Sequence, residues 1–522
     1  MSKFQGSLTR VCAGVSLAVL AFSAAATAPA SGDTKRFVVE FKPGMAAAAR
    51  AALANAGGRI KLEILGGDAV AVEIPTRMLE VLKKHAAIAE ISEDAIRTPF
   101  ATQGAGVPGQ TYLPGQTLPY GIKLVQADQL SDAQTGNRTV CIIDSGYDAS
   151  HEDLAANNVD GEDDPTGAGA WNQDDVHHGT HVAGTIAAIN NTGVGVVGVN
   201  PSKKLHLHIV KVFGPAGWAY SSDLSHAARQ CQAAGANIIS MSLGGPVNNP
   251  LENKTFAALY KAGILSIAAA GNGGNSKVSY PAGYATVVSV AAVDANKAWA
   301  SFSQFNKDVE LAGPGVNVLS TVPMGTGTAS TLSVGGVAYA PGGMDGSPNG
   351  TVSAPLADFG LGDHVDAAVA GKVCLIQRGN IAFSDKVLNC QNSGGVGAVV
   401  YNNVAGGFGG TTGGVATTIP SVTASDTEGA AMEQQLGATA TLAVTPTNYA
   451  YFDGTSMATP HVAGVAALVW SYFPTCTNDQ IRISLQKSAL DLGTPGRDVQ
   501  TGFGLVQAKA AYTRIKSKGC GK

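Results

Sequence analysis

Residues 454–464 read Gly-Thr-Ser-Met-Ala-Thr-Pro-His-Val-Ala-Gly, and they join small residues to the apolar run 462–470. This pattern predicts a loop that passes through Pro460 into a buried helix, with Ser456 where the helix begins. A hydroxyl there lies in the positive end of the helix dipole, where the negative charge of a reaction intermediate is stabilised. Serine alone is a weak nucleophile, so this role requires a base and a group that orients the base.

Two motifs upstream supply candidates for those two roles. Residues 177–184 read His-His-Gly-Thr-His-Val-Ala-Gly, a turn that opens another apolar helix, and His178 is the candidate base. Residues 140–146 read Val-Cys-Ile-Ile-Asp-Ser-Gly, a buried strand that ends at Asp144, the candidate orienting acid. Active sites of open α/β sheets form beyond the carboxyl ends of such strands.

Each of these residues also has a simpler interpretation. The Gly-Thr-Ser turn and Asp144 could only cap a helix and a strand. His177 and His181 have the helical spacing of zinc ligands, although the glutamate of a zinc-peptidase helix is missing. Three motifs in one order, each on the expected kind of element, favour a joint catalytic role.

The order Asp144, His178, Ser456 with these motifs resembles the subtilisin family of serine proteases. The resemblance covers residues from about 116 to 506, apart from one insertion. It implies an α/β fold with a parallel sheet and helices on both faces. Residues 263–272 read as another strand that ends at Asn272, which matches the family's side-chain donor to the oxyanion. The backbone N–H of Ser456 is the expected second donor, and a turn residue is the simpler interpretation of Asn272.

The resemblance also implies where a substrate binds. Ser242, Leu243, Gly244 and Gly245 match the edge strand that pairs with the substrate backbone, and this pairing demands no particular side chains. Ser279 matches the floor of the main specificity pocket. Because Ser279 is small and neutral, we expect apolar or aromatic residues before the cut bond.

The first 28 residues have the pattern of a secretory signal peptide. Lys3 and Arg10 precede the apolar run 11–26, which small residues follow. A membrane anchor is the alternative, but the run is short, and no other stretch is long and apolar enough to span a bilayer. We therefore expect export to the extracellular space and no membrane association afterwards.

Residues 33–100 show a βαββαβ-like pattern of strands and helices. This pattern resembles the inhibitory propeptide of subtilisins, an α+β domain, and implies self-cleavage after Phe100. Arg97 would then lie in a subsite that is usually apolar. Residues 101–115 are rich in Gly, Pro, Thr and Gln, which is typical of a linker.

The resemblance further implies a structural calcium ion. Gln116, Asp153 and Asn191 match the family's calcium-binding positions, with Gln116 in a surface segment. One carboxylate, two amides and the carbonyls of the loop 189–194 would meet calcium's preference for oxygen. No cofactor is expected for the chemistry itself.

Strands and helices alternate through the remaining chain, which implies a parallel sheet. We assign 116–322 and 448–522 to a catalytic domain and its carboxyl-terminal extension. About 120 residues, 323–447, interrupt them, and a structureless loop of that length is improbable. This mostly β insertion resembles the protease-associated domain, whose implied role is contact with substrates or partners; a spacer is the alternative.

Composition and cysteines fit an exported globular protein. The 522 residues are 45% hydrophobic and 14% charged, and the net charge of -4 gives no reason to expect a nucleic-acid partner. Six cysteines remain after Cys12, an even number that suggests disulfides. Cys374–Cys390 and Cys476–Cys520 are the natural pairs, which leaves Cys141 with Cys231, for which buried free thiols are the alternative.

The sequence therefore predicts a monomeric, calcium-stabilised serine endopeptidase that acts on proteins or peptides and is inhibited by its own propeptide. A binding protein on an inactive protease scaffold is the rival from another class. A transpeptidase or peptide ligase would share the same acyl-enzyme.

Overall fold

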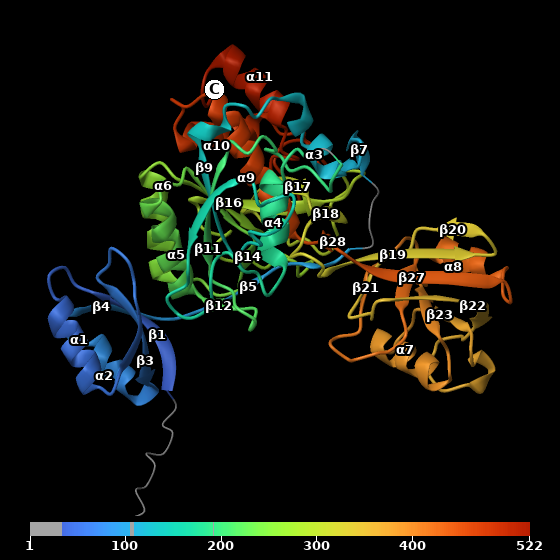
Figure 1. Cartoon of the computed structure of the whole chain (residues 1–522). Coiled ribbons are helices and arrows are strands. Elements are labelled where there is room, and N and C mark those ends of the chain that lie inside the picture. Colours follow the sequence, from blue (N-terminus) through green and yellow to red (C-terminus); the bar gives the residue numbers. More distant parts are fainter. Residues whose placement is uncertain (1–33, 105–108, 192) are drawn as a thin grey trace, which may run out of the picture.

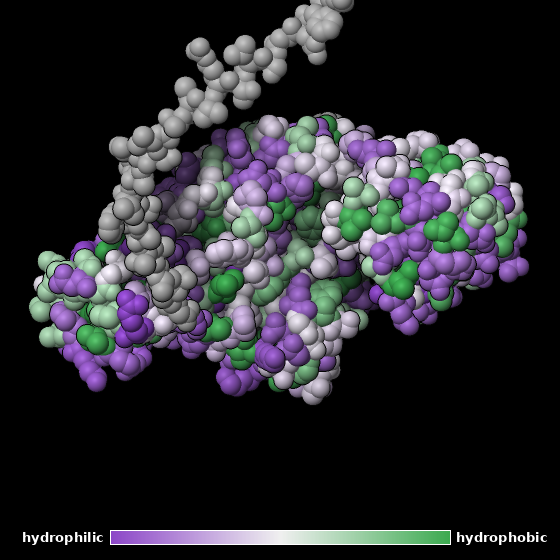
Figure 2. Space-filling view, turned by 90° about the horizontal axis from the view of Figure 1, so that it is seen from below, coloured by the Kyte–Doolittle hydropathy of each residue, from purple (hydrophilic) through white to green (hydrophobic). Residues whose placement is uncertain are grey.

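The computed structural model describes residues 34–104, 109–191 and 193–522, so the expected signal peptide lies outside the described residues. A central unit is flanked by the amino-terminal segment on one side and by the insertion on the other (Figure 1). Figure 2 shows hydrophilic and hydrophobic residues intermingled on one face of these three parts. None of the described helices has the length and apolar character needed to cross a membrane.

The central unit is built on a seven-stranded sheet in the order β10-β11-β9-β13-β15-β16-β17, and all its neighbouring strands are parallel. The strands are β9 (Thr139–Asp144), β10 (Asn158–Glu162), β11 (His206–Lys211), β13 (Ile238–Met241), β15 (Leu265–Ala269), β16 (Val287–Val293) and β17 (Val309–Pro314). Every residue of β13, β15, β16 and β17 is buried, as expected of parallel strands that are covered on both faces.

Helices cover both faces of this sheet. Along β9, Val140 and Ile142 belong to one apolar core, whereas Cys141 and Ile143 belong to a second. The first core contains residues of α4 (His178–Ala187), α9 (Thr455–Tyr472), α10 (Asn478–Ser488) and α11 (Ala508–Lys518); the second contains residues of α5 (Ser221–Ala233) and α6 (Pro250–Lys261). The predicted α/β class is confirmed.

The helix that carries Ser456 begins earlier than predicted. Helix α9 starts at Thr455, so Pro460 lies inside the helix and not in the loop before it. Proline lacks the N–H that would reach the carbonyl of Ser456 four residues back. The Ser242 hydroxyl donates to that carbonyl instead, at 2.7 Å, and thus supplies the missing hydrogen bond.

The amino-terminal segment folds as the predicted α+β unit. Its elements are β1 (Thr34–Phe41), α1 (Ala46–Asn55), β2 (Arg59–Glu63), β3 (Ala69–Pro75), α2 (Leu79–Lys83) and β4 (Ile88–Glu93). Its sheet, in the order β2-β3-β1-β4, packs toward the central unit, because Val38 and Leu62 share an apolar cluster with Leu251 of α6. The next strand, β5 (Ile96–Pro99), leaves this sheet and pairs with the central unit.

The insertion has a sheet and an apolar core of its own. Its sheet contains β19 (Gly327–Val334), β20 (Val337–Tyr339), β22 (Gly350–Asp358), β23 (Val373–Gln377), β24 (Gly397–Tyr401), β26 (Ser421–Ala424) and β27 (Thr439–Thr447), with helices α7 (Phe383–Asn392) and α8 (Asp426–Glu433). The expectation of a mostly β inserted unit is confirmed.

The segment predicted to be a linker contains strands. Strand β6 (Thr102–Gln103) pairs with β28 (Tyr449–Asp453), and β7 (Gln110–Leu113) pairs with β8 (Gln116–Leu118). Residues 101–115 therefore contain two short strands, of which β6 pairs with a strand distant in sequence and β7 forms a local hairpin with β8. Gln116 is also buried and does not lie in a surface segment.

All three predicted disulfides are present: Cys141–Cys231, Cys374–Cys390 and Cys476–Cys520. The first joins β9 to α5, so the alternative of two buried free thiols is wrong.

Candidate active site

The first contact of the site joins the candidate acid to the candidate base. Asp144 is the last residue of β9, and His178 is the first residue of α4. His178 Nδ1 lies 2.7 Å from Asp144 Oδ1, and both side chains are buried. The backbone N–H of Ser145 donates to the same oxygen at 2.8 Å. The carboxylate can therefore fix the tautomer of the imidazole and leave Nε2 free to accept a proton.

A second buried carboxylate fixes the start of α4. Asp174 Oδ2 accepts from the N–H of Thr180 at 2.8 Å, and Asp174 Oδ1 accepts from the N–H of His177 at 2.9 Å. The first backbone N–H groups of a helix have no partner within the helix, and the Asp174 carboxylate accepts from two N–H groups at this end. His177 takes a left-handed conformation, with φ of 70°, and the turn directs His178 toward Asp144.

Ser456 forms no hydrogen bond with His178 in the conformation that the structure describes. Its hydroxyl donates to the carbonyl of Ser242 at 2.8 Å and accepts from the N–H of Phe100 at 2.9 Å. The Nε2 atom of His178 is buried and has no hydrogen-bond partner among the described residues. The structure therefore brings Asp144 and His178 together directly, and it brings Ser456 to the end of the amino-terminal segment.

That end occupies a cleft as an added strand. Strand β5 lies between β14 (Leu243–Gly244) and β12 (Ala219–Tyr220), antiparallel to both. Leu243 pairs with Pro99 and Gly244 with Thr98, so the predicted edge strand holds the chain's own residues. Strand β12 forms the other wall of the cleft, which sequence reasoning did not identify.

The carbonyl of Phe100 is held by the candidate oxyanion donor. Asn272 Nδ2 donates to Phe100 O at 3.1 Å, and Asn272 Oδ1 accepts from the N–H and hydroxyl of Thr455 at 2.9 and 2.8 Å. A side chain at Gly454 would approach the same carbonyl, because an added Cβ would lie 2.1 Å from it. The donor role of the Ser456 N–H remains a prediction.

The predicted specificity pocket lies beside the ring of Phe100. A Cβ added to Gly244 would lie 2.5 Å from Ser279 Oγ and 2.8 Å from Phe100 Cε2, so these three residues are neighbours. Gly245 and Tyr280 exchange backbone hydrogen bonds of 2.8 and 2.9 Å, which tie the edge strand to the segment that carries Ser279. The absence of a side chain at Gly244 therefore makes room for an aromatic ring.

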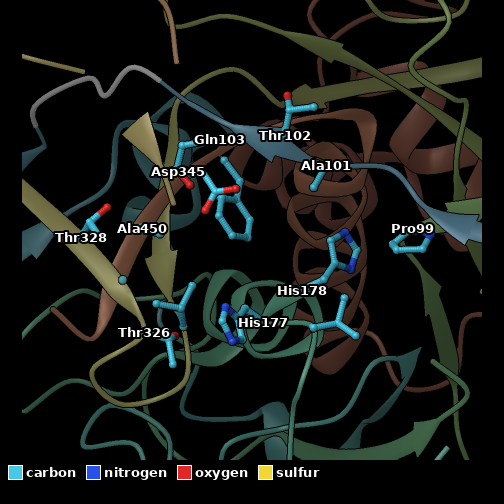
Figure 3. Close-up of a pocket in the computed structure, with 14 residues that line it drawn as sticks. Pro99, Ala101, Thr102, Gln103, His177, His178, Thr326, Thr328, Asp345 and Ala450 are labelled. Atoms are coloured by element: carbon cyan, nitrogen blue, oxygen red, sulfur yellow. The ribbon is translucent and has the colours of Figure 1, made fainter. Parts of the chain in front are cut away.

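The insertion reaches the chain on the other side of the Phe100–Ala101 bond. A cavity of about 320 Å³ is bordered by Thr102, His177 and His178 and also by Asp345 and Thr328 of the insertion (Figure 3). The backbone of the insertion comes close too, since a Cβ added to Gly409 would lie 2.3 Å from Gln103 O. Residues after the bond therefore contact β28 on one side and the insertion on the other.

The three positions predicted to bind calcium lie together. Gln116 Nε2 donates to Asn191 Oδ1 at 2.9 Å and to the carbonyls of Ile189 and Val196 at 3.0 and 3.3 Å. Gln116 Oε1 and Asp153 Oδ1 are buried and have no hydrogen-bond partner among the described residues. Burial raises the pKa of Asp153. Apart from the Gln116 amide nitrogen, the polar atoms gathered here are oxygens, the ligand type that calcium prefers, and two of them are unmatched.

The alternative zinc site gains no support. Within the described part of the chain, no group of three or more His, Cys, Asp or Glu side chains is arranged to hold a metal ion. His181 Nε2 contacts the carbonyls of Val318 and Ala450 at 3.0 and 3.2 Å, and burial lowers the pKa of His181 to about 3. His181 is therefore a neutral core residue.

Sequence reasoning missed two further residues of the cleft. Glu252 and Tyr284 contact each other through a hydrogen bond of 2.6 Å, and Glu252 forms an ion pair with Arg97. The available signal was Arg97, a charged residue at a position expected to be apolar, which called for an acidic partner.

The fold and the site are those of a serine-protease-type hydrolase. A parallel sheet carries an Asp–His pair, and a serine and an amide donor contact the residue before one peptide bond; these residues are Asp144, His178, Ser456 and Asn272. The sequence matches the Subtilase family over residues 136–355 and 389–504, and the PA domain over residues 337–432. The chain belongs to the subtilase family and is a subtilisin-like serine protease with a PA domain.

Similar proteins agree with this assignment. Subtilisin E of Bacillus subtilis is 35% identical over 323 residues, which are 59% of this chain and 79% of that protein. The crystal structure of the psychrophilic subtilisin-like protease Apa1 from Pseudoalteromonas sp. AS-11 is 42% identical, with a TM-score of 0.63, over 78% of this chain and all of that one. The crystal structure of fervidolysin from Fervidobacterium pennivorans shares the fold. It is 21% identical, with a TM-score of 0.60, over 92% of this chain and 61% of that one.

Proposed function

We propose that this protease is an exported endopeptidase, made as a precursor that cleaves itself between Phe100 and Ala101 and prefers apolar or aromatic residues before the cut. The observation that carries the proposal is the position of Phe100. Its carbonyl accepts from Asn272 at 3.1 Å, and its N–H donates to the Ser456 hydroxyl at 2.9 Å. The candidate nucleophile thus lies beside the bond that it would attack.

The chemistry follows from three side chains. The Ser456 hydroxyl turns from the Ser242 carbonyl toward His178 Nε2, which accepts its proton as the oxygen attacks the Phe100 carbonyl. Asp144 keeps the imidazole oriented and stabilises its positive charge. His178 then gives the proton to the leaving amine of Ala101, and water frees the acyl-enzyme by the same route.

The proposal is tested by the amino terminus of the exported protein. We expect the wild-type protein to begin at Ala101 and to react with a serine-directed fluorophosphonate, and Ser456→Ala to remain joined to residues 34–100 and unlabelled. A Ser456→Ala protein that also begins at Ala101 would show that another protease makes the cut. A wild-type protein that is never labelled would favour a binding protein on this scaffold. Product analysis with added amines separates hydrolysis from peptide ligation.

We infer that the set formed by Gln116, Asp153 and Asn191, with the carbonyls of Ile189 and Val196, holds calcium. Its support is the pair of buried, unmatched oxygens at Gln116 and Asp153. Gln116 Nε2 now donates to three of these oxygens, so the ion requires the amide to turn over and present its oxygen to them, which a side-chain amide can do. The ion would tie β8 to the loop after α4 and has no part in the chemistry.

We also infer that the insertion contacts substrates beyond the cut bond. Asp345 and Thr328 border the cavity beside Thr102, which supports contact with substrates more than a spacer role. Deletion of residues 323–447 should then lower cleavage of folded proteins more than cleavage of peptides that end one residue after the cut. Equal losses on both substrates would support the spacer.

Three further expectations remain proposals. Export is supported by the three disulfides, which persist in oxidising compartments. Inhibition by residues 34–100 is supported by the strand that they leave in the cleft. A monomer is the expected state, which the mass of the processed protein in solution would test.

A further inference from the structure

The end of the amino-terminal segment, residues 96–100, is called the tail below. It places a charged side chain at the fourth position before the bond that the site holds. Phe100 precedes that bond, so Arg97 occupies the fourth position, counted back along the chain. The register is fixed by main-chain pairing of Arg97 with Ala219 and of Thr98 with Gly244. Main-chain pairing does not select a sequence, so any selection at this position depends on the side chain.

The Arg97 side chain is fully buried, and its guanidinium donates four hydrogen bonds. Nε and Nη2 donate to the two oxygens of Glu252 at 3.1 and 2.6 Å, which is the bidentate arrangement of a strong ion pair. Nη2 also donates to Val247 O, and Nη1 donates to Ile96 O, both at 3.0 Å.

The partner carboxylate is held in place independently of the arginine. The hydroxyl of Tyr284 donates to Glu252 Oε2 at 2.6 Å, and Asn249 Oδ1 accepts from the N–H of Glu252 at 3.0 Å. Burial, and after it the Glu252 carboxylate, raises the pKa of Tyr284, so the phenol stays a donor. Glu252, Tyr284 and Val247 all follow Phe100 in the chain and stay with the enzyme after the proposed cut.

A second buried arginine–glutamate pair shows why this arrangement is unusual. Arg482 and Glu310 form an ion pair that is also largely buried, but both residues belong to the enzyme and never separate. In the pair of Arg97 and Glu252, Arg97 is released with the tail after the proposed cut. Glu252 then lines an empty subsite that contains no cation. In the part of the chain that the structure describes, Arg97 is the one ion-pair partner of Glu252, so its departure leaves the carboxylate without a compensating charge and the vacated site favours a new guanidinium.

We propose that Glu252 and Tyr284 form a subsite that selects arginine four residues before the cut bond in substrates as well as in the tail. The proposal rests on the proposed endopeptidase function. Arginine is favoured over lysine because only its planar fork reaches both oxygens of Glu252 and a carbonyl together. The expected substrates are extended segments with arginine at the fourth position and an aromatic or apolar residue directly before the cut.

The test uses the processed wild-type enzyme and fluorogenic peptides Ile-Xaa-Thr-Pro-Phe-Ala-Thr-Gln, in which Xaa is arginine, citrulline, lysine or leucine. Citrulline keeps the shape of arginine and lacks its charge. We expect kcat/KM for arginine to exceed that for citrulline by about 100-fold, with lysine between them. An arginine-to-citrulline ratio below about threefold in the wild-type enzyme overturns the proposal, and this result needs no variant.

Two variants locate the effect. Glu252→Gln should reduce the ratio to below about threefold, whereas Glu310→Gln, the matched change in the permanent ion pair, should leave the ratio near 100-fold. A Glu252→Gln enzyme that keeps the full ratio also overturns the proposal. If no peptide is cleaved and fluorophosphonate does not label the enzyme, the proposed function itself fails, which is a different result from equal cleavage of all four peptides.

Discussion

Replacing Asn272 by aspartate tests whether this side chain stabilises the oxyanion. Aspartate has nearly the same shape and keeps the oxygen that accepts from Thr455 at 2.9 and 2.8 Å, but it loses the N–H that lies 3.1 Å from the Phe100 carbonyl. In the wild type this hydrogen bond becomes charge-assisted as negative charge develops on the carbonyl; the aspartate carboxylate also repels that charge, so the contribution of the donor is the minimum loss. In a member of this family such a donor contributes about 3 to 4 kcal/mol, which corresponds to a loss of roughly 100- to 1000-fold in kcat.

The assay is steady-state hydrolysis of Ile-Arg-Thr-Pro-Phe-4-nitroanilide by processed enzyme. We expect kcat to fall by this factor and KM to change little, since the bond strengthens mainly in the transition state. Asn275→Asp is the matched control, because the amide of Asn275 donates at 2.9 Å to Gly273 O in the same loop and not to the tail. A kcat for Asn272→Asp within threefold of the wild type would refute the assigned role.

Two further predictions concern stability and are measured on Ser456→Ala, which cannot digest itself. Chelation of calcium should lower the melting temperature, and Asp153→Asn should abolish that difference; an unchanged melting temperature would contradict the metal site. Burial lowers the pKa of His181 to about 3 and that of His461 to about 4, below the unfolded value of about 6.5. Stability is therefore full above pH 6.5 and decreases as the pH falls toward the folded pKa values. We expect a loss of about 2 kcal/mol per histidine between pH 7.5 and 5, and a smaller loss in His461→Gln; urea unfolding that is independent of pH would refute this.

The sequence predicted that Asp144 and His178 meet because the signals for both are local. Asp144 and His178 each lie where an apolar run meets small or polar residues, and the ends of parallel strands meet at one edge of a sheet. The three disulfides followed from spacing and elimination. By contrast, the start of α9 was misjudged, because Pro460 normally marks a helix boundary and its tolerance here depends on Ser242, more than 200 residues away in sequence.

Contacts between distant segments could not be predicted in the same way. Glu252 lies in the first turn of a helix, where an acidic residue is ordinary and needs no partner. Its pairing with Arg97 spans 155 positions. Strand β6 was hidden for the same reason, since it pairs with β28, far along the chain.

The contacts of the tail differ in what they contribute to cleavage. The ion pair of Arg97 with Glu252 lies three residues away from Phe100, so it is made equally in the bound state, in the transition state and in the cleaved product. It therefore raises kcat/KM and the affinity for the released tail together, without raising kcat. The hydrogen bond from Asn272 strengthens only as the carbonyl gains charge, so it raises kcat. If the proposed self-cleavage takes place, the same arginine would both favour the cut and slow the release of residues 34–100 from the cleft.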